Sequence, residues 1–151
     1  MNTFSFNNCS KDDIEIIFIE CKNMIDKYEN ISEIPYEKVL SWCKEKITKN
    51  IYNYTRILYN DKTIGYYYLI DHGEEFELDD FYILPQYQNK GIGTYILNKI
   101  TSETTRPIFL YVFSQNNIAI NLYKKSGFRK IKSVSDTRFI MEFNNAIVNP
   151  K

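Results

Sequence analysis

The segment Gln88-Asn89-Lys90-Gly91-Ile92-Gly93 decides the interpretation of this chain. It follows a strand-like run over residues 76–84 and precedes a helix-like run over residues 94–104. A glycine-rich turn before a helix directs several backbone N–H groups, and the positive end of the helix dipole, toward one point. Lys90 adds a mobile positive charge beside this turn. The segment therefore predicts a site for the phosphate or pyrophosphate of a small molecule.

Two other phosphate-binding turns do not fit the segment. A Walker A loop ends in Gly-Lys-Ser/Thr, whereas the order here is Lys90-Gly91-Ile92. A dinucleotide-binding turn requires a third small residue three places after the second glycine, and Ile96 stands there. Taken alone, the pattern Gln-x-x-Gly-x-Gly is also compatible with an ordinary strand-to-helix turn that uses glycine for steric reasons.

A second patterned segment begins at Asn116 and ends at Phe128, after the apolar strand-like run over residues 108–113. Asn116 is a favoured N-cap residue, and Gly127 is the residue type that most often ends a helix. One face of the helix between them holds Ala119, Leu122, Tyr123 and Ser126. The segment predicts a short amphipathic helix, in which Tyr123 could equally be an aromatic residue at the edge of the core.

Together, the two segments resemble the signatures of the GNAT superfamily of acetyl-CoA-dependent N-acetyltransferases. The first signature, Gln/Arg-x-x-Gly-x-Gly/Ala after a strand, matches Gln88, Gly91 and Gly93. The second, Asn-x-x-Ala-x-x-Leu-Tyr-x-x-x-Gly-Phe, matches Asn116, Ala119, Leu122, Tyr123, Gly127 and Phe128. The resemblance is specific over residues 76–128 and diffuse elsewhere.

The order of the expected elements agrees with this resemblance. Strands are expected at residues 3–9, 52–59, 63–70, 76–84, 108–113, 128–134 and 138–143, and helices at residues 12–28, 36–48, 94–104 and in the second signature. The buried side of the first helix is expected to include Ile16, Ile19 and Ile25, and Trp42 is expected in the core or a cleft wall. The implied fold is of the α/β (α+β) class. It is a GNAT-like mixed, mostly antiparallel central sheet, with splayed parallel strands 4 and 5 and flanking helices, in a single domain over residues 1–151.

Length and charge exclude several function classes. The length of 151 residues is typical of a single domain. The 19 basic and 19 acidic side chains give a formal net charge of zero, which argues against a nucleic-acid partner. The chain has no apolar run of bilayer length, and residues 1–6 do not resemble a secretory signal. Its three cysteines, at no metal-like spacing, favour reduced thiols, a cytoplasmic location and no metal.

The resemblance implies where acetyl-CoA binds. In the family, the cofactor enters where two neighbouring parallel strands splay apart, and the amides of pantetheine pair with strand backbone. Here the strand contacts would come from Phe81, Tyr82 and Ile83. The pyrophosphate would be bound by the first signature, Gln88, Asn89, Lys90, Gly91, Ile92, Gly93 and Thr94, and Asn116 would touch the pantetheine or the diphosphate.

The chemistry of acetyl transfer sets further requirements. The amine needs a base, the tetrahedral oxyanion needs a donor such as a backbone N–H near Tyr82, and the thiolate gains from an acid. By resemblance, Tyr123 is that acid. The base is left open between Glu77 and Asp80, because Tyr111 occupies a position where other family members carry a base. Each carboxylate could instead be a solvated surface group, and the single histidine, His72, is expected to be a solvated turn residue.

The predicted function is transfer of an acetyl group from acetyl-CoA to a primary amine of a small-molecule or peptide acceptor. Direct attack in a ternary complex is favoured, because none of the cysteines lies in either signature to form an acyl intermediate. The first alternative is a non-catalytic acyl-CoA-binding or sensing module, and the second is a structural or partner-binding domain. The acceptor and the oligomeric state stay open, although homodimers are common in the family.

Overall fold

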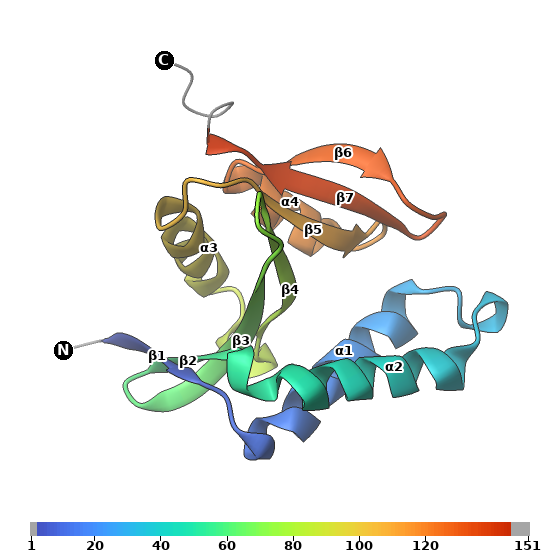
Figure 1. The fold of residues 1–151 in the computed structure, drawn as a ribbon, viewed down its shortest axis with the longest axis horizontal. Coiled ribbons are helices and arrows are strands. Elements are labelled where there is room, and N and C mark those ends of the chain that lie inside the picture. The colour runs from blue at the N-terminus through green and yellow to red at the C-terminus, as the bar shows by residue number, and fades with distance from the viewer. Residues whose placement is uncertain (1–2, 146–151) are drawn as a thin grey trace. The chain divides into compact units, whose positions relative to one another are not determined.

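The structure is a computed structural model that describes residues 3–145 (Figure 1). The expected order of strands and helices is confirmed. Short 3-10 turns occur at Lys11–Asp13, Ile31–Glu33, Ile51–Asn53 and Pro85–Tyr87. The main elements are β1 (Phe4–Asn8), α1 (Ile14–Tyr28), α2 (Tyr36–Asn50), β2 (Thr55–Tyr59), β3 (Lys62–Asp71), β4 (Phe76–Ile83), α3 (Ile92–Ser102), β5 (Ile108–Phe113), α4 (Asn117–Lys125), β6 (Arg129–Ser133) and β7 (Arg138–Phe143).

The strands form one mixed sheet in the order β1-β2-β3-β4-β5-β7-β6. The pairs β1–β2, β2–β3, β5–β7 and β6–β7 are antiparallel, and β4–β5 is parallel, so the expected fold class is confirmed. The parallel register joins Phe76 to Ile108 and Glu77 to Phe109 at the start of both strands. By contrast, β5 pairs with β7 along its whole length, from Ile108 to Phe113.

The structure divides into two compact units, which we describe separately. The N-terminal unit contains the residues up to Tyr68 together with Asp80–Leu84. The C-terminal unit contains Leu69–Asp79 and the chain from Pro85 onward. Both β3 and β4 therefore contribute residues to each unit.

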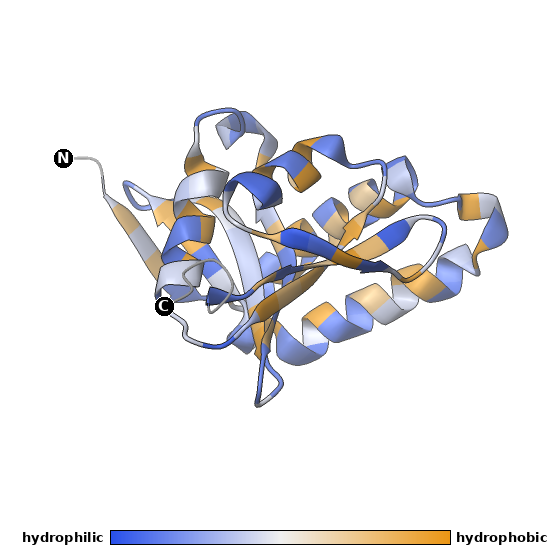
Figure 2. Cartoon of the chain, turned by 90° about the horizontal axis from the view of Figure 1, so that it is seen from above, coloured by the Kyte–Doolittle hydropathy of each residue, from blue (hydrophilic) through white to orange (hydrophobic). Residues whose placement is uncertain are grey.

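In the N-terminal unit, α1 and α2 lie side by side (Figure 1). Hydrophilic and hydrophobic residues alternate along both helices, as expected of helices with one buried face (Figure 2). The side chains that are almost completely buried in this unit are Ile17, Ile47, Ile51, Tyr54, Ile57, Ile64 and Tyr66.

Two details predicted for the helices are wrong. The buried face of α1 consists of Ile17, Cys21 and Ile25, one turn apart, so Ile16 and Ile19 point to the exposed side and only Ile25 was assigned correctly. Trp42 on α2 is exposed rather than in the core, and the Lys38 ammonium lies 5.9 Å from the centre of its ring.

Two element boundaries also differ from the predictions. β2 begins at Thr55 rather than residue 52, because residues 51–53 form a 3-10 turn that buries Ile51. The Tyr54 N–H closes this turn on the Ile51 carbonyl at 3.2 Å. α3 begins at Ile92, two residues earlier than expected, and extends back to the glycine turn itself.

In the C-terminal unit, α3 and α4 pack against each other, and the apolar faces of β5 and β7 supply further core residues. The almost completely buried side chains here are Ile96, Leu97, Ile108, Leu110 and Met141. Within residues 3–145, no helix combines the length and the apolarity needed to cross a membrane.

Gly65 in β3 leaves no room for a side chain. A methyl group at this position would lie 2.4 Å from the Tyr82 carbonyl oxygen and 3.3 Å from the Ile83 Cα. Because both neighbours are backbone, Gly65→Ala forces strand β4 to move, and we expect a loss of about 2 kcal/mol in the free energy of unfolding. Urea unfolding measures this loss. Lys62→Ala, at the exposed start of the same strand, is the control, and equal midpoints for the two variants would contradict the prediction.

The three cysteines are free thiols in unequal environments. Burial, followed by the nearby Asp13 carboxylate, raises the pKa of the Cys9 thiol to about 12. A hydrogen bond with Cys43, together with burial, raises the pKa of Cys21 above its ordinary value. Because the thiolate is the reactive form, we expect 5,5′-dithiobis(2-nitrobenzoate) at pH 8 to label only the half-buried Cys43 quickly in the folded protein. Cys43→Ser should abolish the fast phase, and rapid labelling of all three thiols would refute the expectation.

Candidate functional site

The loop over residues 88–91 presents backbone N–H groups at the start of α3. Gly91 is the N-cap and adopts φ +78°, a left-handed conformation that favours glycine. The first intrahelical bond joins the Tyr95 N–H to the Gly91 carbonyl at 3.1 Å, so the N–H groups of Ile92, Gly93 and Thr94 precede the helical ladder. Gln88, Asn89 and Lys90 are exposed around them. This geometry suits an anion such as a pyrophosphate.

The second glycine of the turn has a different role. A methyl group at Gly93 would lie 3.1 Å from Cδ2 of Leu122 on α4. Gly93 therefore lets α3 and α4 approach closely, and it joins the two sequence signatures in one contact within the C-terminal unit.

Both ends of α4 are capped as the sequence predicts. The Asn116 side chain accepts a hydrogen bond from the Ala119 N–H at 3.2 Å, so Asn116 is the N-cap. At the other end, Gly127 has φ +97°, the Phe128 N–H bonds to the Tyr123 carbonyl at 3.0 Å, and the Gly127 N–H bonds to the Lys124 carbonyl at 3.1 Å. This pair of bonds is a Schellman motif, which fixes the backbone of Tyr123.

Tyr123 is buried and sits in an environment that keeps its hydroxyl protonated. Its ring centre lies 5.7 Å from that of Phe128. Burial, and to a smaller extent the negative charge of Asp79, raises the pKa of Tyr123 above its ordinary value near 10. Tyr123 is therefore a proton or hydrogen-bond donor at any physiological pH.

In the N-terminal unit, Asp80 is a buried carboxylate with partners on both oxygens. Oδ2 accepts a hydrogen bond from the Tyr54 hydroxyl at 2.6 Å and lies 2.9 Å from the Lys46 ammonium. Oδ1 accepts a hydrogen bond from the Tyr82 hydroxyl at 3.0 Å. These contacts give both oxygens of Asp80 partners inside the unit.

The backbone of β4 is irregular at Asp80, where φ is +46°. Such a value in the middle of a strand interrupts the regular alternation of side chains. The three residues that follow it, Phe81, Tyr82 and Ile83, are half-buried, and all belong to the N-terminal unit.

In the C-terminal unit, Glu77 pairs with the single histidine. Oε1 of Glu77 lies 3.0 Å from Nε2 of His72, and the imidazole stacks on Phe109 with ring centres 5.7 Å apart. His72 is an exposed residue of the turn between β3 and β4, as expected, and it also contacts Glu77 and Phe109. Tyr111, two residues beyond Phe109, is exposed, and the two rings meet edge to face.

The structure gathers the predicted residues into two sets. The C-terminal unit holds the loop over residues 88–94, Asn116, Tyr123 and Glu77, whereas the N-terminal unit holds Asp80 and the strand backbone after it. The sequence analysis did not identify His72, Lys46 or Tyr54 as partners of the candidate carboxylates. For His72 a signal existed, because a tight turn between β3 and β4 brings residues on either side of it together. We find no comparable signal for Lys46 or Tyr54.

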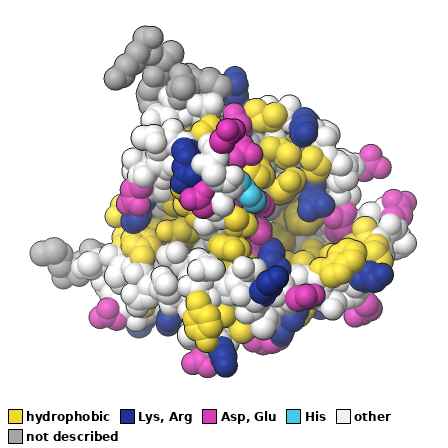
Figure 3. Space-filling view, in the orientation of Figure 1, with side chains coloured by type: hydrophobic (Ala, Val, Ile, Leu, Met, Phe, Trp, Pro, Cys, Tyr) yellow, Lys and Arg dark blue, Asp and Glu magenta, His cyan; other side chains and the backbone are white. Residues whose placement is uncertain are grey.

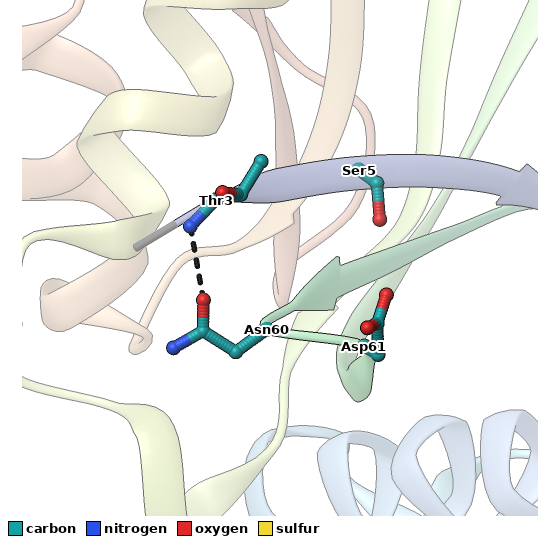
Figure 4. A pocket seen from close by; sticks show the side chains of 4 residues that line it. All are labelled: Thr3, Ser5, Asn60 and Asp61. Carbon is teal, nitrogen blue, oxygen red and sulfur yellow. Dashed lines mark hydrogen bonds between the residues drawn. The ribbon is translucent and has the colours of Figure 1, made fainter. Parts of the chain in front are cut away.

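Two further observations concern other ligand classes. A pocket at the start of β1 is lined by Thr3, Ser5, Asn60 and Asp61, and the Thr3 N–H bonds to Oδ1 of Asn60 at 3.0 Å (Figure 4). None of these residues belongs to the predicted site. Among residues 3–145, no group of three or more His, Cys, Asp or Glu side chains is arranged to hold a metal ion.

The sequence was compared with known families and curated proteins. The model of the acetyltransferase (GNAT) family matches residues 16–128. Thialysine N-epsilon-acetyltransferase of Mus musculus is 37% identical to this chain over 70 residues, which are 42% of the chain. The chain spans 41% of the length of this curated relative.

Solved structures extend the similarity over nearly the whole chain. PaiA N-acetyltransferase from Thermoplasma acidophilum, in complex with coenzyme A, gives a TM-score of 0.67 at 25% identity and covers 94% of this chain and 99% of its own. An N-acetyltransferase from Staphylococcus aureus Mu50 gives a TM-score of 0.70 at 14% identity, and the match covers 91% of this chain and 99% of that protein. Spermidine N-acetyltransferase from Vibrio cholerae, in complex with CoA and spermine, gives 0.64 at 19% identity, covering 93% and 94%.

Proposed function

Because this chain belongs to the acetyltransferase (GNAT) family, we propose that it transfers an acetyl group from acetyl-CoA to a primary amine of a small molecule. The reaction proceeds by direct attack of the amine on the thioester in a ternary complex. One acetyltransferase domain covers residues 1–151, and the protein acts in the cytoplasm.

One observation carries this proposal: the close approach of Gly93 to Leu122. It places the anion-binding start of α3 next to α4, the helix that bears Asn116 and Tyr123, within one compact unit. A structural turn needs a glycine for its left-handed residue, but it does not need a buried tyrosine on the neighbouring helix. A site that binds a diphosphate and also acts on a thioester needs both the glycine turn and the tyrosine.

The cofactor is bound by backbone more than by side chains. The N–H groups that open α3, together with Gln88, Asn89 and Lys90, hold the pyrophosphate. Backbone groups of Phe81, Tyr82 and Ile83 pair with the amides of pantetheine, and an N–H in this segment stabilises the tetrahedral oxyanion. Asn116 contacts the pantetheine or the diphosphate through its side-chain amide, whose oxygen also caps α4.

We assign the base to Glu77 rather than to Asp80. Both oxygens of Asp80 already accept hydrogen bonds or an ion pair, so an amine could approach either oxygen only by displacing one of these contacts. Glu77 is held on one oxygen by His72, so its second oxygen can accept the proton of the amine. Asp80 then supports the shape of β4.

Tyr123 donates a proton or a hydrogen bond to the departing thiolate. In water a tyrosine is a weaker acid than a thiol, with pKa values of about 10 and 8.5, so transfer is uphill. Burial raises both pKa values, because a buried tyrosine and a buried thiol each hold their proton more tightly than in water. Cys9 illustrates the effect in this protein, since burial raises its pKa to about 12.

The acceptor that we propose is a small aliphatic amine with additional positive charge. Two similar proteins are named for such acceptors, thialysine and spermidine. In this chain, Glu77 and Asp79 give the half-buried part of β4 two negative charges, which favour a cation.

Thermal unfolding with acetyl-CoA, with NADH and ATP as controls, tests the proposal. A ligand at about 100 times its dissociation constant adds roughly 2.7 kcal/mol of stability, which raises the melting temperature by roughly 5 to 10 °C for a chain of this size. We expect this shift with acetyl-CoA and not with NADH. Release of CoA thiol with spermidine, thialysine and lysine as acceptors then measures turnover.

The outcomes separate the alternatives. A shift with thiol release supports the acetyltransferase. A shift with no release on any amine would favour a non-catalytic acyl-CoA-binding module. No shift at millimolar acetyl-CoA would leave the glycine turn with a structural role only.

A further inference from the structure

We propose that His72 is a positioning residue that holds the Glu77 carboxylate in the orientation in which Glu77 accepts the proton of the acceptor amine. The inference rests on the proposed function, and it assigns a role to the single histidine of the chain. Three features of the C-terminal unit carry it: the contact between the two side chains, the support beneath the imidazole, and the anchoring of the turn that bears it.

The contact fixes one oxygen of Glu77 and leaves the other available. Nε2 of His72 lies 3.0 Å from Oε1 of Glu77. Because an ionised carboxylate only accepts hydrogen bonds, Nε2 must carry the proton and donate it. The Glu77 side chain is 16% exposed and that of His72 is 44% exposed, so the imidazole is the more solvated member of the pair. In Figure 3 the imidazole, coloured cyan, is visible at the surface.

One face of the imidazole stacks against an aromatic ring. Its plane lies 28° from that of Phe109, with ring centres 5.7 Å apart. Phe109 is also the register partner of Glu77 in the parallel pair β4–β5. The strand pairing therefore places Glu77 beside the ring on which His72 stacks, and this leaves the imidazole little freedom to rotate away.

Arg106 anchors the turn that carries His72. Its Nη1 bonds to Oδ1 of Asp71 at 2.8 Å and its Nη2 to Oδ2 at 3.2 Å, a two-point contact, and Nη1 also bonds to the Gly73 carbonyl. The guanidinium lies 3.8 Å from the ring centre of Phe76, the first residue of β4. Within the turn, the His72 N–H bonds to the Glu75 carbonyl at 2.9 Å. His72 is thus held by residues on both sides of it in the chain.

The proton transfer balances without a net change at His72. The amine N–H bond breaks, an O–H bond forms at Oε2 of Glu77, and the nitrogen lone pair forms a C–N bond to the thioester carbon while the carbonyl electron pair moves to the oxygen. When this oxyanion collapses, the C–S bond breaks and CoA leaves as the thiol, with the proton that Tyr123 donates. The Nε2–H of His72 stays on the imidazole throughout and keeps Oε2 directed at the amine. After the product leaves, the proton on Glu77 passes to water.

Steady-state kinetics with the amine accepted in the thiol-release assay test the role. We expect Glu77→Gln to lower kcat about 100-fold and His72→Ala about 10-fold. The KM for acetyl-CoA should stay unchanged in both. His72→Gln keeps an N–H donor at the same reach and should recover kcat to within about 3-fold of the wild type. Glu74→Ala, an exposed residue of the same turn, is the matched control.

The double variant supplies a sharper criterion. If His72 acts only through Glu77, His72→Ala should add nothing to the effect of Glu77→Gln. Multiplied losses in the double variant would overturn the inference, as would wild-type kcat in His72→Ala. A raised KM for acetyl-CoA with unchanged kcat would likewise assign His72 to cofactor binding instead.

A measurement that needs no turnover separates this inference from the proposed function. In untagged protein the imidazole ¹⁵N signals come from His72 alone. They should show the proton on Nε2 in the wild type, and a mixture of tautomers in Glu77→Ala. This result without any acetyl transfer would remove the proposed function while the His72–Glu77 contact stands. A spectrum that Glu77→Ala leaves unchanged would overturn the contact itself.

Discussion

Tyr123→Phe lowers kcat for acetyl transfer by about 100-fold or more, and it leaves the KM for acetyl-CoA close to that of the wild type. The substitution removes one hydroxyl from a side chain that is buried against Phe128. The ring and its packing remain, so the fold and the cofactor site should survive. The lost step is donation to the departing thiolate.

The dependence on pH distinguishes this acid from others. Because burial and the Asp79 charge raise the pKa of Tyr123 above its ordinary value, the hydroxyl keeps its proton as the pH rises through 10. The rate of the wild type should therefore not decline between pH 7 and pH 10 through ionisation of Tyr123. The pH profiles of the wild type and of Tyr123→Phe should then have the same shape in that range. A decline in that range that disappears in the variant would mean that Tyr123 ionises there. Tyr95→Phe, an exposed tyrosine on α3, serves as the control.

Asp80→Asn should cost about 2 to 3 kcal/mol of folding free energy, the larger of the two stability effects predicted here. The amide keeps the size of the side chain, but it removes the carboxylate charge that lies 2.9 Å from the Lys46 ammonium in the wild type. It also weakens the hydrogen bonds from Tyr54 and Tyr82. The estimate lies at the low end for a buried ion pair because the Lys46 side chain is 34% exposed.

Urea unfolding of a double-mutant cycle measures this cost. Lys46→Met removes the other charge of this ion pair, so the double variant should be more stable than the sum of the two single losses predicts. Glu45→Gln, an exposed neighbour on α2, is the control. Strict additivity would show that Lys46 and Asp80 do not interact in solution. If Asp80→Asn abolished acetyl transfer while remaining folded, Asp80 rather than Glu77 would be the base.

The sequence predicted those parts of the protein in which local chemistry decides the structure. Gly91, Asn116 and Gly127 adopt the conformations that their residue types favour at helix ends, so the bounds of α3 and α4 could be derived within two residues. The order of strands and helices could be predicted from the same residues at turns and helix ends, and the mixed sheet from the family resemblance.

Other features depend on contacts that local patterns do not encode. The first helix is apolar at too many positions for its periodicity to reveal which side is buried, and the packing of Ile17 and Cys21 decides it. Two partners of Asp80 come from α2 and from the residue before β2, about 30 residues away in sequence, so no spacing rule could identify Lys46 or Tyr54. The stacking of His72 is a similar case, since its neighbour Phe109 comes from another strand.

The narrow space between Gly93 and Leu122 also constrains how this chain can vary or be recombined. The glycine turn and the α4 helix are in direct contact. A larger residue at position 93 therefore requires a smaller residue at position 122, and the reverse. Transplanting the loop of a relative without its α4 helix should misplace the loop, whereas exchanging both together should not. We therefore expect the two signatures to tolerate exchange only as a pair, although about 30 residues separate Gly93 from Leu122 in the sequence.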